Sequence, residues 1–195
     1  MTRILIALFE DAEELDWAGP WEVLAAWADR WPDDGVTVRT VARDAGPVRC
    51  AKGLRVLPDH TWADAPRPDV LVYPGGQGTR RDLADPDVLA WVTSMAKAGT
   101  LMTSVCTGSL VFAAAGLLDG RAATTHWGSV ERLGTLGRDI EVRGDDRFVD
   151  SGEVVTAAGV SAGIDMALHL VARLHSPDRA REVRRYIQYD PDPPV

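Results

Sequence analysis

Short apolar runs alternate along this chain with amphipathic segments, and this alternation limits the folds that the chain can adopt. The runs at 3–9 (RILIALF), 69–78 (DVLVYPGGQG, ending in a glycine turn) and 100–105 (TLMTSV) are typical of strands covered on both faces. The segments at 19–31 and 85–99 carry apolar residues at helical spacing. Strands that alternate with helices of about ten to fifteen residues predict an α/β fold, with a doubly wound, mostly parallel sheet and helices on both faces.

Turn and capping residues predict where the helices begin and end. In the first helix, Pro20 is expected at the first helical position, with Gly19 as the cap. Asp85 is the expected N-cap of the second helix, and Gly99 its C-terminal stop. Further strands are expected at 36–43 and 121–127.

Two hairpins and two closing helices complete the pattern. The segment 46–59 is expected to turn near Lys52, which places Cys50 on a strand. A second hairpin is expected at 147–159. The last two helices are expected to begin after Ser161 and Ser176, and the tail at 190–195 is expected to form neither element.

Length, charge and cysteine content restrict the class of protein. The chain has 195 residues, which fits a single domain over 1–195, and its formal charge of -8 does not suit a nucleic-acid partner. Two cysteines do not make a disulfide framework. The N-terminal apolar run is short and followed by acids, so it resembles neither a secretory leader nor a membrane span. We therefore expect a cytoplasmic protein without membrane partners.

Cys106 lies where a predicted strand passes directly into a predicted helix. Free cysteines are often small buried hydrophobic residues, and that interpretation stays open. A side chain at a tight strand-to-helix turn, however, projects over the edge of the sheet, as in a nucleophile elbow. The N-terminus of the following helix is expected to favour the thiolate and lower the pKa of the thiol. The position therefore favours a reactive cysteine.

Two other loops are expected at the same edge, because sites in doubly wound sheets lie beyond the carboxyl ends of the strands. One carries Asp16 and the other carries Gly75 and Gly76. An Asx turn would explain Asp16, and a simple turn would explain the glycines. If Asp16 instead faces Cys106, the two groups titrate as a coupled pair and Asp16 can act as acid or base.

Gly75 and Gly76 are candidate oxyanion-binding positions, because residues without a Cβ let backbone amides approach a reacting centre. The pair lacks the spacing of a nucleotide-binding motif. His126 ends a predicted short strand and is either a residue of the same cleft or an ordinary core or surface histidine. The four histidines have no paired ligand spacing, so no metal and no other cofactor is expected.

Four segments, in order and across nearly the whole chain, resemble the ThiJ/PfpI superfamily (class I glutamine amidotransferase-like) of flavodoxin-like proteins. They are LDWAGPWEVL, YPGG, SVCTGSLVFAAAGLLDGRAATTHW and GVSAGIDMALHL. Within the superfamily, the chain looks most like the isocyanide hydratase branch. The resemblance implies a flavodoxin-like fold, a homodimer, a nucleophile at Cys106, an acid–base residue at Asp16, and Thr107 beside the nucleophile. It also implies backbone oxyanion contacts at Gly76 and Thr107, with Gly75 as a further candidate.

Differences from other branches narrow the expected activity. The PfpI peptidases have histidine directly after the nucleophile, where this chain has Thr107, so a Cys-His protease is not expected. The deglycase-like members have glutamate where this chain has Asp16, which weakens a glyoxalase-type interpretation. A similar domain forms the N-terminal half of AraC-type regulators, whose helix-turn-helix segment has no counterpart in this sequence.

The resemblance therefore predicts a cysteine-dependent lyase that hydrates an isocyanide, R–N≡C, to an N-substituted formamide. Two alternatives remain. One is a non-enzymatic ligand- or redox-sensing module related to the regulators, since an exposed thiolate oxidises readily. The other is a glyoxalase-type hydratase of 2-oxoaldehydes. In the hydratase, we expect Asp16 and Cys106 to share one negative charge that resides mainly on sulfur.

Overall fold

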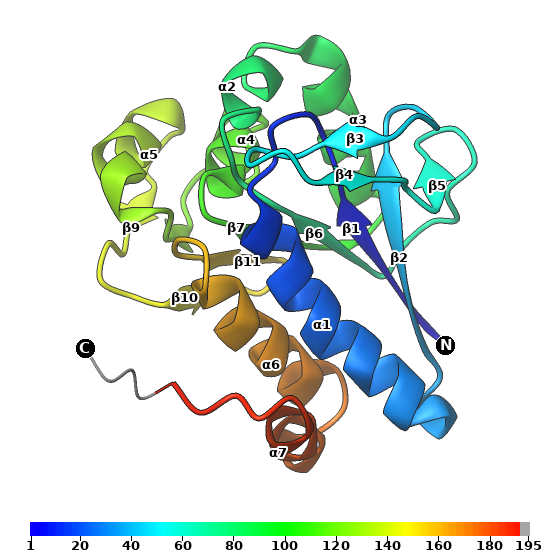
Figure 1. Ribbon diagram of the computed structural model, residues 1–195. Helices are drawn as coiled ribbons and strands as arrows, with labels where there is room; N and C mark the ends of the chain where they lie inside the picture. The colour runs from blue at the N-terminus through cyan, green and yellow to red at the C-terminus, as the bar shows by residue number, and fades with distance from the viewer. Residues whose placement is uncertain (192–195) are drawn as a thin grey trace.

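The computed structural model describes residues 1–191. Within them, the main sheet has seven strands in the order β10-β11-β7-β6-β1-β2-β5 (Figure 1). Neighbouring strands run parallel except β10 and β11, which form the predicted antiparallel hairpin. The strands are β1 (Thr2–Ala7), β2 (Val36–Ala42), β5 (His60–Thr61), β6 (Val70–Tyr73), β7 (Leu101–Val105), β10 (Phe148–Asp150) and β11 (Val154–Ala157).

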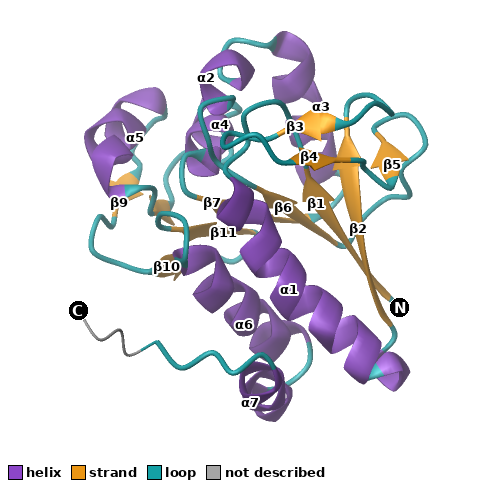
Figure 2. Cartoon of the chain, viewed as in Figure 1, coloured by secondary structure: helices purple, strands orange, loops and turns teal. Residues whose placement is uncertain are grey.

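Helices cover both faces of this sheet (Figures 1 and 2). Alternate residues of β1 belong to two cores: Ile4 and Ile6 pack with α1, α6 and α7, whereas Leu5 and Ala7 pack with α3, α4 and α5. The fold is therefore the predicted flavodoxin-like, doubly wound α/β class. The helices are α1 (Glu14–Arg30), α2 (Thr79–Asp82), α3 (Pro86–Lys97), α4 (Gly108–Ala114), α5 (Val130–Leu136), α6 (Ala162–Leu174) and α7 (Pro177–Tyr186).

Short elements surround the sheet. The predicted hairpin at 46–59 is present, but Cys50 follows its first strand instead of lying on it, and the Cys50 N–H donates to the Leu54 carbonyl at 2.8 Å. None of the helices over residues 1–191 is long and apolar enough to cross a membrane. The small pairs are β3 (Val48–Arg49) with β4 (Arg55–Val56) and β8 (Ala122–Ala123) with β9 (Glu141–Val142), and the 3-10 helices are η1 (Pro32–Asp34) and η2 (Trp127–Ser129).

The first helix begins earlier than predicted. It starts at Glu14, so Asp16 lies in its first turn, and Pro20 lies inside the helix instead of at its start. Proline cannot donate a backbone N–H to the carbonyl four residues earlier, which is why it usually marks a helix boundary. Here the Pro20 ring lies against Gly163 of α6, where even a Cβ would be 3.1 Å from it. Close packing between α1 and α6 thus compensates for the missing hydrogen bond.

Two of the four predicted N-caps form their hydrogen bonds, and Gly19 lies inside α1 instead of capping it. The Asp85 side chain accepts from the N–H groups of Asp87 and Val88, and the Ser176 side chain accepts from the N–H of Arg179. Ser161 is the cap residue of α6, but its side chain makes no capping bond because its backbone is already helical. Of the tail at 190–195, residues 192–195 lie outside the described part of the chain.

Candidate active site

Cys106 occupies the turn between β7 and α4. Its φ is 58°, in the left-handed region that residues other than glycine rarely adopt. The Cys106 N–H donates to the Ala158 carbonyl at 2.9 Å, and the Cys106 carbonyl accepts from Thr125 Oγ1 at 2.9 Å and Ser109 Oγ at 3.0 Å. These hydrogen bonds, two of them between residues far apart in the sequence, hold the strained elbow in place. The residue is buried, with only 6% of its surface exposed.

Asp16 is completely buried in the first turn of α1. Its Oδ2 accepts a hydrogen bond from the Gly75 N–H at 2.9 Å, while Oδ1 has no nitrogen or oxygen donor among residues 1–191. The carboxyl group also lies close enough to the Cys106 side chain for each group to shift the pKa of the other. The structure thus brings these two residues together, and the Asx-turn explanation of Asp16 does not apply.

Burial raises the pKa of both groups. It raises the pKa of Asp16 from 3.8 to about 7, against the stabilising Gly75 N–H. Burial and the Asp16 charge raise the pKa of Cys106 to about 12, against the amides of Thr107 and Val160. The predicted lowering of the thiol pKa is therefore wrong, because these amides do not offset desolvation. At neutral pH about half of the Asp16 carboxyl groups are ionised, and the negative charge of the pair lies on the carboxylate and not, as predicted, on sulfur.

The glycine pair brings its loop unusually close to Asp16 and Thr107. A Cβ on Gly75 would lie 2.5 Å from the Thr107 nitrogen and 2.8 Å from Asp16 Oδ2, so no other residue fits without displacing them. Gly76 has a φ of 123°, and its N–H donates to Thr107 Oγ1 at 3.0 Å. Two of the three candidate oxyanion amides, those of Gly75 and Gly76, are therefore already engaged, one with Asp16 and one with Thr107, whereas the Thr107 amide faces Cys106. Their role as oxyanion donors stays a prediction, and it requires these bonds to open.

Two residues of this region were not predicted from the sequence. Thr79 Oγ1, at the start of α2, donates to the Gly76 carbonyl at 2.8 Å and lies 3.1 Å from Thr107 Oγ1. Val160 carries an amide that faces Cys106, and its φ of 49° is rare for a β-branched residue. The available signals were weak: Thr79 ends the segment GGQGT, and Val160 follows a strand in the segment GVSAG.

His126 lies one loop away from the cysteine. Its Nδ1 accepts from the Gly128 N–H at 3.1 Å, and its ring packs against Gly159, which directly precedes Val160. The half-buried imidazole therefore contacts the loop that faces Cys106, so a role in the cleft stays a prediction. Over residues 1–191, no group of three or more His, Cys, Asp or Glu side chains is arranged to hold a metal ion.

Comparisons with known proteins agree with this architecture. A model of the DJ-1/PfpI family matches residues 2–173. The chain belongs to the DJ-1/PfpI family. It is 42% identical to an isonitrile hydratase from Pseudomonas putida, over 98% of this chain and 80% of that protein. The transcriptional regulator CdhR from Pseudomonas aeruginosa is 31% identical over 80% of this chain, which spans about half of that protein's length (46%).

Solved structures give the same result for the fold. A THiJ/PfpI family protein from Pseudomonas syringae superposes with a TM-score of 0.90 and 33% identity, over 100% of this chain and 77% of that one. The DJ-1beta structure from Drosophila melanogaster superposes with a TM-score of 0.83 and 22% identity, over 97% of this chain and 98% of that one. At such low identity, this second likeness concerns the fold alone.

Proposed function

We propose that this protein is a cysteine-dependent isocyanide hydratase, a lyase that converts R–N≡C and water into the N-substituted formamide. The observation that carries the proposal is the buried Asp16 carboxyl group, which lies close enough to the elbow thiol of Cys106 for each group to shift the pKa of the other. The similarity to an isonitrile hydratase over 98% of this chain supports the choice of substrate.

The first step joins sulfur to carbon. The Asp16 carboxylate takes the proton of the Cys106 thiol as the sulfur attacks the terminal isocyanide carbon, and then delivers that proton to the same carbon. The product is a thioimidate, cysteinyl S–CH=N–R, in which one S–C bond and one C–H bond have formed. A carboxyl group with a pKa of about 7 is suited to both transfers, because at neutral pH it can accept a proton and give it up again with little cost.

The second step adds water. Asp16 removes a proton from water as the oxygen attacks the thioimidate carbon, and passes this proton to the nitrogen. Collapse of this adduct breaks the S–C bond, transfers the proton of its hydroxyl group to the Cys106 sulfur and releases R–NH–CHO. The sum of the two steps is one isocyanide plus one water giving one formamide, without an external oxidant or reductant.

The restricted approach to the thiol favours the same substrate class. Cys106 is 6% exposed and lies close to Asp16 and to the amides of Thr107 and Val160. The terminal isocyanide carbon is slender and carries no substituent, so it can reach a thiol that a substituted carbonyl carbon reaches only with more displacement of the walls.

The test is turnover of a varied isocyanide panel, followed by formamide formation, with methylglyoxal assayed in parallel. Cys106→Ala is expected to abolish isocyanide turnover, and Asp16→Asn to lower it by about a hundredfold or more, the scale of general acid–base catalysis. Cys50→Ala is the matched control, because that buried cysteine belongs to the hairpin after β2, and it should keep full activity.

Three results would overturn the proposal. They are no turnover of any isocyanide by protein whose Cys106 is still alkylated by iodoacetamide, full activity in Asp16→Asn, and turnover of methylglyoxal alone. The last would favour the glyoxalase-type alternative. A ligand that raises thermal stability without being consumed, together with no turnover, would favour the sensing module.

We also propose that the protein forms a homodimer, as the family resemblance implies, and that it acts in the cytoplasm, as its cysteine content and N-terminal sequence predict. Sedimentation at micromolar concentration tests the first statement, and a single monomeric species would contradict it.

A further inference from the structure

A buried pair of hydroxyl groups lies beside the candidate active site. Thr79 Oγ1, at the start of α2, is 3.1 Å from Thr107 Oγ1, in the turn before α4. Thr79 is completely buried, and Thr107 is 3% exposed. Each threonine hydroxyl has one hydrogen to donate and two lone pairs that accept. The positions open to the two hydrogens can therefore be traced from the neighbouring atoms.

More donors face the Gly76 carbonyl oxygen than its two lone pairs can serve. Thr79 Oγ1 lies 2.8 Å from this oxygen, and Arg80 Nη1 lies 2.9 Å from it. The Thr79 backbone nitrogen and Thr107 Oγ1 are both farther away, at 3.3 Å. The two shortest contacts occupy the two lone pairs, so the hydrogen of the Thr107 hydroxyl is only weakly held.

The Thr107 hydroxyl also lies next to the groups that react. A Cβ on Gly75 would be 2.7 Å from Thr107 Oγ1 and 2.8 Å from Asp16 Oδ2, so both oxygens lie close to the same point. Thr107 directly follows Cys106, and its amide faces the thiol. A weakly held hydroxyl hydrogen is therefore available beside the cysteine and the carboxyl group.

The nitrogen of the substrate becomes an acceptor during the reaction. In an isocyanide, the lone pair of the nitrogen belongs to the triple bond and is not free to accept a hydrogen bond. Addition of the Cys106 sulfur to the terminal carbon frees that lone pair on the thioimidate nitrogen. When water adds, the nitrogen gains a second lone pair, which takes the proton that Asp16 passes on. A hydroxyl donor near this nitrogen thus stabilises the states after sulfur addition, and not the bound isocyanide.

We propose that Thr107 donates a hydrogen bond to this nitrogen and that Thr79 is the positioning residue for that donation, an inference that rests on the proposed hydratase activity. As the Thr107 hydrogen turns from the Gly76 carbonyl to the nitrogen, the Thr79 hydrogen turns from the same carbonyl to Thr107 Oγ1.

This rotation loses no hydrogen bond. The Gly76 carbonyl keeps the Arg80 guanidinium, and Thr107 Oγ1 keeps the Gly76 N–H at 3.0 Å while it accepts from Thr79. The new bond from Thr79 polarises the Thr107 hydroxyl and strengthens its donation to the nitrogen. Both hydrogens stay on their own oxygen atoms, and no covalent bond changes.

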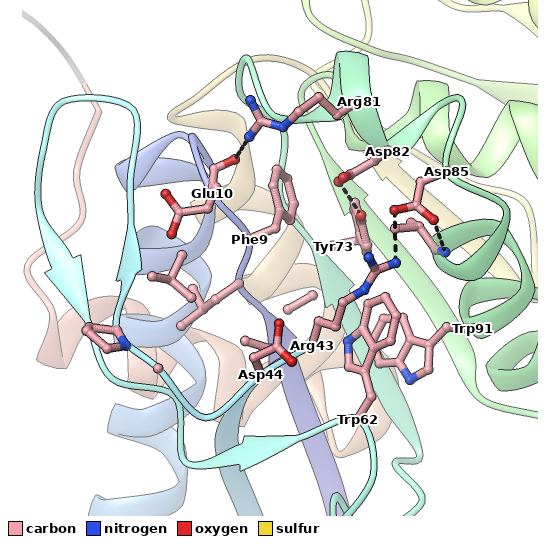
Figure 3. Close-up of a pocket in the computed structure, with 17 residues that line it drawn as sticks. Phe9, Glu10, Arg43, Asp44, Trp62, Tyr73, Arg81, Asp82, Asp85 and Trp91 are labelled. Atoms are coloured by element: carbon pink, nitrogen blue, oxygen red, sulfur yellow. Dashed lines mark hydrogen bonds and ion pairs between the residues drawn. The ribbon is translucent and has the colours of Figure 1, made fainter.

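The helix that carries Thr79 is anchored to the sheet. At the end of α2, Asp82 Oδ2 accepts from the hydroxyl of Tyr73, a residue of β6, at 2.6 Å. Asp82 there lines a cavity of about 530 Å³ that also contains Arg43 (Figure 3). This bond fixes α2, so only the hydrogen of the Thr79 hydroxyl has to move.

The test measures kcat and KM with the isocyanide of the panel that the wild type turns over fastest. Thr79→Val keeps the shape of the side chain and removes the hydroxyl. It is expected to lower kcat about tenfold, the scale of one hydrogen bond, and to leave KM within about twofold, because the bound isocyanide does not use the bond. Thr79→Ser restores the hydroxyl and should return kcat to within about threefold of the wild-type value.

Thr100→Val is the matched control. Thr100 is also buried, and its Oγ1 donates to a backbone carbonyl, that of Pro68 at 2.9 Å, but it precedes β7, at the opposite end of the strand from Cys106. This variant should keep kcat within about twofold of the wild-type value. Thermal unfolding checks that the variants fold, and Thr79→Ala removes the same hydroxyl should Thr79→Val not fold.

A double-mutant cycle separates positioning from a merely structural effect. If Thr79 acts through Thr107, Thr79→Val has no further effect on kcat once Thr107→Val has removed the donor, whereas independent effects multiply. Multiplied effects, a wild-type kcat in Thr79→Val, or equal losses of kcat in Thr79→Val and Thr100→Val would each overturn the role of Thr79. Absence of isocyanide turnover by the wild type would instead overturn the proposed function, and this role with it.

Discussion

The buried carboxyl group of Asp16 makes the stability of this protein depend on pH, and Asp16→Asn removes that dependence. The pKa of Asp16 is about 7 in the folded chain and returns to its ordinary value of 3.8 when the chain unfolds. The folded state therefore binds more protons than the unfolded state between these two pH values. The contribution of the Asp16 carboxyl group to stability is fully present below pH 3.8, and is lost as the pH rises to about 7.

The size of the effect follows from the two pKa values. They differ by about 3, and each pH unit of difference corresponds to 1.36 kcal/mol, so the free energy of unfolding falls by about 4 kcal/mol between pH 4 and pH 8. Asparagine does not titrate, and its side-chain oxygen can still accept the hydrogen bond from the Gly75 N–H. Between pH 4 and pH 8, the free energy of unfolding of Asp16→Asn is therefore expected to rise by about 4 kcal/mol relative to that of the wild type.

Urea unfolding at each pH from 4 to 8 measures this difference. Subtracting the wild-type curve from the Asp16→Asn curve cancels the other carboxyl groups, whose titration the two proteins share. Asp29→Asn is the matched control, since Asp29 is an exposed residue of the same helix. The free energy of unfolding of this variant should stay within about 0.5 kcal/mol of the wild-type value at each pH. Parallel wild-type and Asp16→Asn curves over the whole range would refute the reasoning.

Two further substitutions test the geometry. Gly75→Ala places a Cβ 2.5 Å from the Thr107 nitrogen and 2.8 Å from Asp16 Oδ2. Turnover in the formamide assay should therefore fall by about a hundredfold, and the free energy of unfolding in urea by about 1–3 kcal/mol. Full turnover would contradict this prediction. Ser176→Ala removes a formed N-cap and should lose about 1 kcal/mol in urea unfolding, whereas Ser161→Ala, where no cap bond exists, should lose under about 0.5 kcal/mol; equal losses would show that the cap contributes nothing.

The sequence by itself determined the alternation of strands and helices and the elbow position of Cys106. Both are local properties: hydropathy periodicity distinguishes a buried strand from an amphipathic helix, and the change from one to the other identifies the turn. Parallel strands end at one edge of a sheet, so strand direction alone places the loops with Asp16 and Gly75 near the cysteine. Local side chains also sufficed for the N-caps of Asp85 and Ser176.

Only the tertiary structure decided how far α1 extends and which groups carry charge. Pro20 remains inside a helix because it packs on Gly163, more than a hundred residues away in the sequence. The raised pKa of Cys106 comes from burial under several elements, which no helix N-terminus reveals in advance. The cavity that contains Arg43 and Asp82 likewise joins residues from separate strands and helices. Long-range packing sets desolvation and side-chain partners, and neither is encoded in a local pattern.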